Sequence, residues 1–395
     1  MDSNPRELYT DRRPALRESA SLIQSSGSSG TSTESPLSAA QLGLWFAQQL
    51  DPQNAAFNVG EYLEILGPID PAQFEATLRQ VMLETELLRI RLVERAGEPL
   101  QIIVAPAQWS LPFFDVSGEA DPTAAALSSM RADLQRPTDL LRGPLFAFAL
   151  FKAEADRFLW YARYHHIVID GLSRSLIARR VADVYTALAG GSLPDASAVG
   201  PLTAIVADDV AYRASDDFAR DRQHWIEYLE GAPDPTSIAD GHFVQSRGVL
   251  RRTVHLHAPG TARLRAIGRL SRVVTAATAL LMHRLTRAED LVLGLAVAAR
   301  SDATRSAAGM AANVVPLRLK VDPGASVRAI SLPKCFRINV TDSPICGAIW
   351  AALAMIGPST IRSSIFSRST TNSGLQVPLS LSPTCPPVRS KTFPS

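Results

Sequence analysis

A strand that leads directly into a helix, with two histidines and an aspartate at the junction, is the feature that most constrains this fold. Side chains alternate over residues 157–166, which places the adjacent His165 and His166 on opposite faces of a strand. Beyond the turn, apolar residues recur at helical spacing from Leu172 to Leu188, and Ser173 is the predicted N-cap. We therefore expect His166 beside a helix N-terminus, where developing negative charge is tolerated.

The junction also carries a motif. Residues 165–171 read HHIVIDG and match every fixed position of HHxxxDG, the hallmark of the condensation domains of non-ribosomal peptide synthetases, which this chain resembles. Related acyltransferases built on the chloramphenicol acetyltransferase plan also carry this heptapeptide. Two further segments resemble condensation-domain motifs. Residues 38–45 resemble S-x-A-Q-x-x-x-W, with Ser38, Gln41 and Trp45 at its fixed positions. Residues 309–318 resemble G-x-x-x-N-x-x-P-x-R, with Gly309, Asn313, Pro316 and Arg318 at its fixed positions. The resemblance extends from about Pro36 to about Val327, and residues 161–173 look closest to siderophore-forming synthetases.

The resemblance implies a reaction in which an amine attacks a thioester. Both reactants are carried on the phosphopantetheine arms of carrier proteins that dock on opposite sides of a tunnel, and no cofactor is bound directly. An α-amino group has a pKa of about 7.7 to 8.0, so it must lose a proton to become nucleophilic at neutral pH. His166 is the candidate catalytic residue. Its imidazole could accept that proton or hydrogen-bond the tetrahedral intermediate.

Three other residues are expected to support this site. Asp170 follows His166 by four positions, across the turn, so we expect it to brace the turn rather than to carry protons. In the family this aspartate pairs with an arginine, and Arg300, after the apolar run 291–299, is the candidate here. Gly171 is expected to let the backbone turn closely enough for the tunnel to stay open.

Each of these residues also has a purely structural interpretation. His165 faces away from His166 and is expected to be structural, and Arg300 could be an ordinary surface arginine. A metal site at the histidines is not expected, because adjacent strand residues cannot both turn to one ion. Ser38 and Gln41 form a capping box, and the helix that they start would bury Leu42, Trp45 and Phe46.

Composition excludes several classes of function. A net charge of +2 gives no sign of a nucleic-acid partner. No apolar stretch reaches about 18 residues and the N-terminus lacks the apolar core of a signal peptide, so a membrane-independent, cytoplasmic protein is expected. The three cysteines, Cys335, Cys346 and Cys385, predict neither a disulfide framework nor a zinc site, being odd in number and without paired spacing.

The fold class expected is α/β, as two chloramphenicol acetyltransferase-like halves that face each other across a cleft with His166 at its floor. We expect a disordered leader over 1–35, an N-terminal half over 36–189, a linker over 190–201, a partial C-terminal half over 202–327 and an aberrant, disordered tail over 328–395. The strands are expected at 57–65, 89–94, 100–104, 145–152, 157–166, 250–256, 291–299 and 313–319. The helices are expected at 71–84, 122–135, 202–213, 218–229 and 276–285.

The chain changes character after about Val327. Residues 328–395 hold one acidic residue, Asp342, and seven basic ones, whereas residues 1–327 hold 37 acidic and 33 basic residues. Ser, Thr and Pro dominate, and the family's remaining elements of the second half are not recognisable there. Our hypothesis is a shift of the reading frame near Val327, and the alternative is a natural low-complexity tail.

Three functions therefore compete. The first is a condensation domain that forms an amide between carrier-bound groups, with donor and acceptor carrier proteins and an adenylation domain, in the same or a neighbouring chain, as partners. The second is a free-standing acyltransferase of the same superfamily, which transfers an acyl group to a soluble alcohol or amine. The third is an inactive, truncated remnant, so whether this chain is an active enzyme stays open on the sequence alone.

Overall fold

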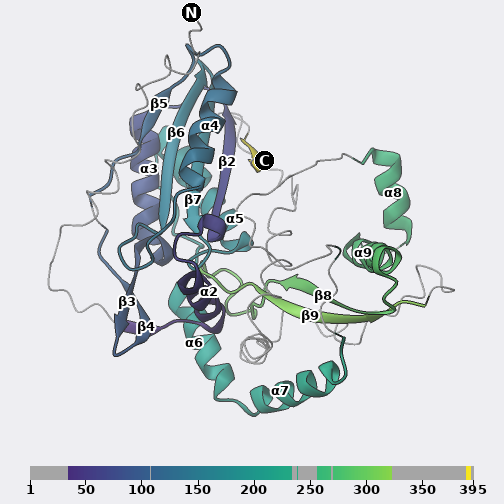
Figure 1. Cartoon of the computed structure of the whole chain (residues 1–395). Helices are drawn as coiled ribbons and strands as arrows, with labels where there is room; N and C mark the ends of the chain where they lie inside the picture. The colour runs from purple at the N-terminus through teal and green to yellow at the C-terminus, as the bar shows by residue number, and fades with distance from the viewer. Residues whose placement is uncertain are drawn as a thin grey trace, which may run out of the picture.

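A five-stranded sheet forms the centre of the first half of the chain, in the order β10-β2-β7-β6-β5 (Figure 1). The computed structural model describes residues 34–106, 108–233, 238, 256–267, 270–322 and 388–392. The strands of this sheet are β2 (Asn58–Leu66), β5 (Phe113–Asp115), β6 (Phe146–Glu154), β7 (Arg157–His165) and β10 (Val388–Thr392). All neighbours are antiparallel except β5 and β6, which run parallel.

Helices cover both faces of this sheet. Helices α3 (Pro71–Glu84) and α5 (Gly171–Ala189) pack with one face of β7, including Trp160 and Tyr164, in the main core. Helix α4 (Pro122–Leu134) packs on the other face, against Leu159 and Tyr161 among others. The predicted alternation along β7 is therefore confirmed. Because both faces are buried, the strand reads as an almost continuous apolar run.

A second, three-stranded sheet lies beside the start of α2 (Ala39–Leu50), in the order β1-β4-β3. Its strands are β1 (Glu34–Pro36), β3 (Ile90–Arg95) and β4 (Glu98–Ile103), and short 3₁₀ turns lie at η2 (Ala55–Phe57) and η3 (Glu86–Arg89). The predicted leader is two residues too long, because β1 starts at Glu34 and pairs with β4. The predicted buried stripe of α2 is wrong at Phe46, whose side chain is 60% exposed, while Trp45 is buried.

Within its described residues, the second half consists mostly of helices and a two-stranded sheet. Its elements are α6 (Leu202–Arg213), α7 (Asp216–Leu229), α8 (Ala258–Ile267), α9 (Leu270–Thr286), β8 (Asp290–Val297) and β9 (Asn313–Lys320). Strands β8 and β9 are antiparallel, and Ala279 of α9 packs against Leu291 and Leu317 of these strands. The strand expected at 250–256 lies outside the described residues apart from Leu256, which belongs to no strand.

Most of the predicted aberrant tail, including its three cysteines, lies outside the described residues. The exception is β10, which pairs antiparallel with β2 from Val388 opposite Ile65 to Thr392 opposite Glu61 (Figure 1). These five residues depart from the expectation of an unpacked tail. Val388 is the one apolar residue among the five, so no alternation of apolar and polar residues marks a strand here in the sequence.

The segment between β8 and β9 joins the two halves. Residues 307–311 contribute to the same core as β7 and α5, and Gly200 forms a bridge with Ala307. Gly309 lies directly against α6: a Cβ atom on this residue would be 2.3 Å from Cδ1 of Leu202 and 3.0 Å from Cδ1 of Ile205. A methyl group at 309 would therefore force the side chain of Leu202, or the 307–311 segment itself, to move.

We predict that Gly309→Ala destabilises the chain by about 1–3 kcal/mol, because the added methyl group overpacks a buried contact. Leu202→Ala in the same chain would remove the clash, so the double variant should lose less stability than the sum of the two single variants. Urea denaturation of the single and double variants measures these losses of stability. Gly118→Ala is the matched control, since a Cβ there meets no atom within 4 Å. Equal effects at 309 and 118 would contradict the packing argument.

Candidate active site

His166 is the first residue after β7, which ends one residue earlier than expected. Its backbone N–H donates to the carbonyl of Phe57 at 2.8 Å, so the start of the turn is tied to the segment before β2. From Phe158 to Asp170 every residue is buried except His166, which is partly exposed. The turn therefore presents a single side chain, the imidazole of His166, to its surroundings.

The ring of His166 is held in one tautomer. Nδ1 lies 2.8 Å from the carbonyl oxygen of Ile169 in the same turn. A backbone carbonyl can only accept a hydrogen bond, so in the neutral ring Nδ1 carries the proton and Nε2 presents a lone pair. Burial lowers the pKa of His166, opposed by the hydrogen bond to Ile169 and the charge of Asp170. The neutral imidazole, with Nε2 as a proton acceptor, is the form favoured at neutral pH.

His165 has the opposite arrangement, with both ring nitrogens occupied. Its Nδ1 accepts the backbone N–H of Ile167 at 3.2 Å, and its Nε2 lies 3.1 Å from Oε1 of Gln48 on α2. The amide nitrogen of Gln48 donates to two carbonyls, those of Asp51 and Asn54, so its oxygen is the acceptor for His165. Burial lowers the pKa of His165 to about 3, with the charges of His166 and Arg163 adding to the effect. No lone pair is left on this ring for chemistry.

Asp170 caps helix α5 with one carboxylate oxygen. Its Oδ1 accepts from the backbone N–H and the hydroxyl of Ser173, at 2.8 and 2.7 Å. The predicted N-cap at Ser173 is wrong: the helix begins at Gly171, Asp170 is the cap, and Ser173 lies three residues beyond it. Aspartate and serine both serve as N-caps, so the sequence alone does not separate the two positions.

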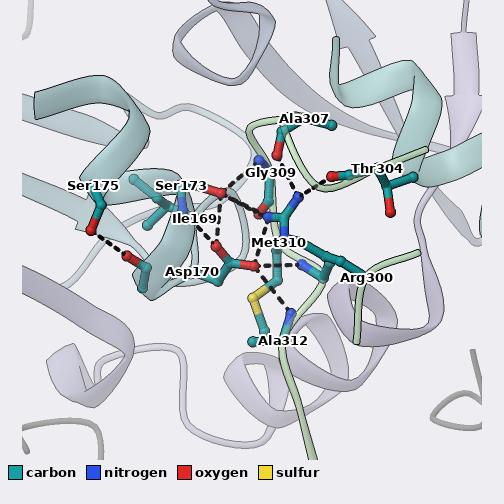
Figure 2. Close-up of polar contacts among 12 residues, drawn as sticks. Ile169, Asp170, Ser173, Ser175, Arg300, Thr304, Ala307, Gly309, Met310 and Ala312 are labelled. Carbon is teal, nitrogen blue, oxygen red and sulfur yellow. Dashed lines mark hydrogen bonds and ion pairs between the residues drawn. The ribbon is translucent and has the colours of Figure 1, made fainter. Parts of the chain in front are cut away.

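The other carboxylate oxygen of Asp170 binds the second half of the chain. Its Oδ2 lies 2.8 Å from Nη2 of Arg300 and accepts the backbone N–H groups of Ala311 and Ala312, each at 3.2 Å. Figure 2 shows this carboxylate between Arg300 and Ala312. Both side chains of the ion pair are almost completely buried, with 3% of Arg300 and 1% of Asp170 exposed. The pair implied by the family resemblance is present in the structure.

Arg300 extends this network across the segment that joins the halves. Its Nη1 donates to the carbonyls of Thr304 and Ala307, and its Nη2 donates to the hydroxyl of Ser173 and the carbonyl of Gly309, both at 2.9 Å. The Ser173 hydroxyl also accepts the backbone N–H of Gly309 at 2.9 Å. Asp170 therefore receives N–H and O–H donors from both halves of the molecule (Figure 2).

Gly171 is not required by the backbone. Its φ angle lies outside the left-handed region, and a Cβ atom there would meet only Nη2 of Arg174, at an ordinary contact distance of 3.9 Å. The backbone of the turn therefore does not require glycine at 171, and the expectation that Gly171 keeps the tunnel open stays a prediction. Because Gly171 has no side chain, the space beside the Arg174 guanidinium stays free.

The 38–45 motif holds the turn from the other side. Ser38 and Gln41 form the predicted capping box of α2. In addition, Nε2 of the fully buried Gln41 donates to the carbonyl of Ile167 at 3.2 Å and to Oε1 of Gln101 on β4 at 3.0 Å. The capping pattern accounts only for the local role of Gln41. Its contact with the histidine turn had no signal in the sequence except a long polar side chain on a helix face that is otherwise apolar.

The 309–318 motif is divided between two places. Gly309 lies at the Asp170 network, whereas Asn313, Pro316 and Arg318 belong to β9. Arg318 forms a two-pronged ion pair with Asp290 of β8 and donates to the carbonyls of Glu230 and Gly231 after α7. These contacts fasten β9 to its neighbours. Pro316 lies opposite Gly294 of β8, and Oδ1 of Asn313 accepts the backbone N–H of Val314 at 2.7 Å.

Sequence reasoning missed two charged residues beside the site. Arg174 lies in the first turn of α5, and its Nη1 is 3.1 Å from Oε2 of Glu61 in the middle of β2. Burial raises the pKa of Glu61, opposed by the charge of Arg174. Two signals were available: a glutamate at the centre of a largely apolar strand, and an arginine at a helix N-terminus, where the helix dipole disfavours a cation.

The described residues include no group of three or more His, Cys, Asp or Glu side chains that could hold a metal ion. Within the same part of the chain, no helix is both long enough and apolar enough to cross a membrane.

Comparison with known proteins identifies this arrangement. The family model "Condensation domain" matches residues 31–331. Among curated proteins, a dimodular nonribosomal peptide synthase of Bacillus subtilis is 43% identical over 296 residues, which are 73% of this chain and 12% of that protein. An isonitrile lipopeptide synthase of Streptomyces coeruleorubidus is 39% identical over 303 residues, 75% of this chain and 21% of that protein. Enterobactin synthase component F of Shigella flexneri, a siderophore-type synthetase, is 31% identical over 297 residues, 72% of this chain and 23% of that protein.

Solved structures agree with the sequence relatives. The starter condensation domain of rhizomide synthetase superposes with a TM-score of 0.71 at 35% identity, covering 80% of this chain and 76% of that chain. The first condensation domain of the calcium-dependent antibiotic synthetase superposes with a TM-score of 0.68 at 34% identity, covering 82% of this chain and 74% of that chain.

These likenesses confirm the mixed α/β fold of the chloramphenicol acetyltransferase type and do not favour a free-standing acyltransferase. The cleft between the halves stays a prediction, as does the cytoplasmic location.

The chain spans less than a quarter of the length of the three curated relatives. With three motifs, the fold and the family match in agreement, the chain belongs to the condensation-domain family of nonribosomal peptide synthetases.

Proposed function

We propose that this chain catalyses amide formation between an acyl or peptidyl thioester and the amine of an aminoacyl acceptor, with His166 as the catalytic residue. Each substrate is carried on the phosphopantetheine arm of a carrier protein. The observation that carries the proposal is the fixed tautomer of His166: the Ile169 carbonyl holds the Nδ1 proton at 2.8 Å and leaves Nε2 as the acceptor on the one partly exposed side chain of the turn.

The chemistry follows from this geometry. The acceptor ammonium transfers a proton to Nε2 of His166, and its nitrogen attacks the thioester carbonyl to give a tetrahedral intermediate. This attack forms the C–N bond. Collapse of the intermediate then breaks the C–S bond, the departing phosphopantetheine thiolate takes the second proton from the nitrogen, and the imidazolium of His166 returns its proton to solvent. A positioned base of this kind contributes about 10²- to 10⁴-fold in rate. Lowering of the pKa of His166 by burial keeps the ring neutral and ready to accept the proton.

Asp170 and Arg300 position the catalytic turn without taking part in proton transfer. Both carboxylate oxygens of Asp170 are occupied by donors, and the residue is 2% exposed. His165 fixes the end of β7 through Gln48. Solved structures of the rhizomide synthetase starter domain carry substitutions of a histidine and of an arginine eight positions after it, and His166 and Arg174 have this spacing. That spacing supports the assignment of the site to this turn.

The partners that we propose are donor and acceptor carrier proteins and an adenylation domain, in the same or a neighbouring chain. The support is that the relatives are peptide synthases of which this chain matches only one part. The phosphopantetheine enters with the substrates, so the chain itself binds no cofactor.

We predict that His166→Ala lowers the rate of amide formation by at least about a hundredfold, because the base for the amine is lost. The measurement is the yield of dipeptidyl product from two loaded carrier proteins, analysed by mass spectrometry. His165→Ala is the comparison, and it should reduce stability more than the rate of the folded enzyme. Small and equal losses of rate in the two variants would contradict the assignment of His166 as the catalytic residue.

We predict that Asp170→Asn lowers the free energy of unfolding by about 3–5 kcal/mol, because the variant leaves the Arg300 cation buried without a counter-charge. Asp302→Asn is the matched control, since Asp302 pairs with Arg305 in a bridge whose side chains are 85% and 67% exposed. An exposed pair of this kind contributes about 0–1 kcal/mol. A well-folded Asp170→Asn variant with a purely catalytic defect would instead assign Asp170 a direct role in proton transfer.

We predict that acid destabilises the fold through His165. The pKa of His165 is lowered to about 3 in the folded chain, below its unfolded value, so the folded state binds fewer protons. The stability that the folded chain gains from a neutral His165 is fully present above about pH 6.5. It is lost as the pH falls toward the folded pKa, and the free energy of unfolding then falls by about 1.4 kcal/mol per pH unit. His165→Gln should flatten the dependence of unfolding free energy on pH between about pH 6 and 5. The exposed His257 provides the control, as His257→Gln should leave the slope unchanged.

A further inference from the structure

An arginine at the start of α5 occupies an electrostatically unfavourable position. Arg174 is in the first turn of the helix, directly after the histidine turn. Its Nη2 lies 3.9 Å from the place where a Cβ of residue 171 would be, so the side chain folds back along the helix toward its N-terminus. The helix dipole is positive at this end and opposes a second positive charge. A cation kept in such a place needs a compensating anion.

Glu61 supplies that anion from a different element. It lies in the middle of β2, opposite Ala162 of β7, and its Oε2 is 3.1 Å from Nη1 of Arg174. The side chains of Arg174 and Glu61 are 20% and 12% exposed. A pair in this environment is screened less than a surface pair, so its charges act on neighbouring groups over several ångströms. The pair joins β2 to the first turn of α5, on either side of the end of β7.

The charge of His166 is influenced by Asp170 in the turn and by Arg174 on α5, and His165 is its neighbour at the end of β7. His165 of β7 is neutral, because burial lowers its pKa to about 3. Asp170 in the turn raises the pKa of His166, but Arg300 and several N–H donors bind that carboxylate. Arg174 lowers the pKa of His166 and is itself balanced by Glu61. Of these groups, the Glu61–Arg174 pair is the partly exposed one.

We propose that the Glu61–Arg174 ion pair is a positioning element of the reaction centre that sets the charge state of the His166 imidazole. Arg174 disfavours the imidazolium form, so that the ring is free to take a proton from the acceptor amine. Glu61 limits this effect, so that the imidazolium is not excluded once the proton has been transferred. The role in the reaction rests on the proposed function, whereas the electrostatic coupling does not.

The two members of the pair should therefore have opposite effects on His166. Arg174→Gln removes the cation and leaves Glu61, so the titration midpoint of His166 should rise. Glu61→Gln leaves Arg174 unbalanced, so the midpoint should fall. The expected shifts are about half a pH unit or more, the size that a full charge produces at about 10 Å in an effective dielectric of about 40. The double variant should titrate between the two single variants.

Nuclear magnetic resonance of the full chain, labelled at histidine, measures these midpoints directly. The resonance of His166 is assigned by its absence from a His166→Gln variant. Arg179→Gln removes the same charge from an exposed position on the same helix and should leave the midpoint unchanged. Arg174→Lys keeps the charge and should also keep the midpoint, which separates charge from the shape of the side chain if Arg174→Gln folds poorly.

The outcomes distinguish this inference from the proposed function. Opposite shifts in Arg174→Gln and Glu61→Gln support the coupling, and the acidic limb of the pH profile of kcat/KM should then move in step with each midpoint. Equal midpoints in the unaltered chain and in both single variants, or shifts of the same sign, would overturn it. Full amide-forming activity in His166→Ala would refute the proposed function and leave the titration result standing.

Discussion

The ion pair between Asp170 and Arg300 is the interaction on which the arrangement of the site depends. Asp170 caps helix α5 with one oxygen and binds Arg300 with the other, so a single carboxylate fixes both the turn after β7 and the segment that returns from the second half. Two buried charges are costly to desolvate, and they are tolerated only when further hydrogen bonds satisfy them. Here those bonds come from Ser173, Gly309, Ala311 and Ala312. Because of these bonds, neither oxygen of the Asp170 carboxylate is free to accept a proton. Asp170 is therefore a structural residue, whereas His166 has a free ring nitrogen.

The three sequence motifs are far apart in the chain and converge on this turn. Gln41 of the first motif donates to the carbonyl of Ile167, within the second motif. The backbone N–H of Gly309, at the start of the third motif, donates to the hydroxyl of Ser173, just after the second. The Ser38 hydroxyl reaches the carbonyl of Met310 at 3.5 Å, which connects the first motif to the third. Most of these contacts end on backbone carbonyls, so they depend on the path of the chain more than on the identity of the receiving side chain.

The sequence predicts the helices and strands whose bounds are set by residues next to them in the chain. Helix α3 begins and ends as expected, because Asp70 caps it and Pro71 occupies its first position. Strands β6 and β7 follow from alternation and a short turn. At the site, His166 and the pairing of Asp170 with Arg300 were available only through the family resemblance, since 130 residues separate the partners of the pair. Spacing along the chain contains no information about such a contact.

Other features were beyond sequence reasoning for identifiable physical reasons. Residues Glu61 and Arg174 meet only because β2 pairs with β7 in one register, and a shift of that register by one residue would turn Glu61 to the other face of the sheet. Phe46 is exposed although its spacing from Leu42 is helical, because α2 packs through Trp45 and Leu44 instead. Both cases depend on which neighbour an element meets, and local patterns do not specify the neighbour.

The long sequence separation of the Asp170–Arg300 pair has a consequence for the order of assembly. When the chain has been synthesised as far as α5, Asp170 can already cap that helix through Ser173, since the two residues are three positions apart. Its second oxygen has no cation until residues 299–312 have been made and packed against α6. Contacts of this separation form late, because a long loop must close before they contribute. We therefore expect the turn that presents His166 to form in part early and to be completed only when the two halves have docked, so that the position of His166 depends on that docking.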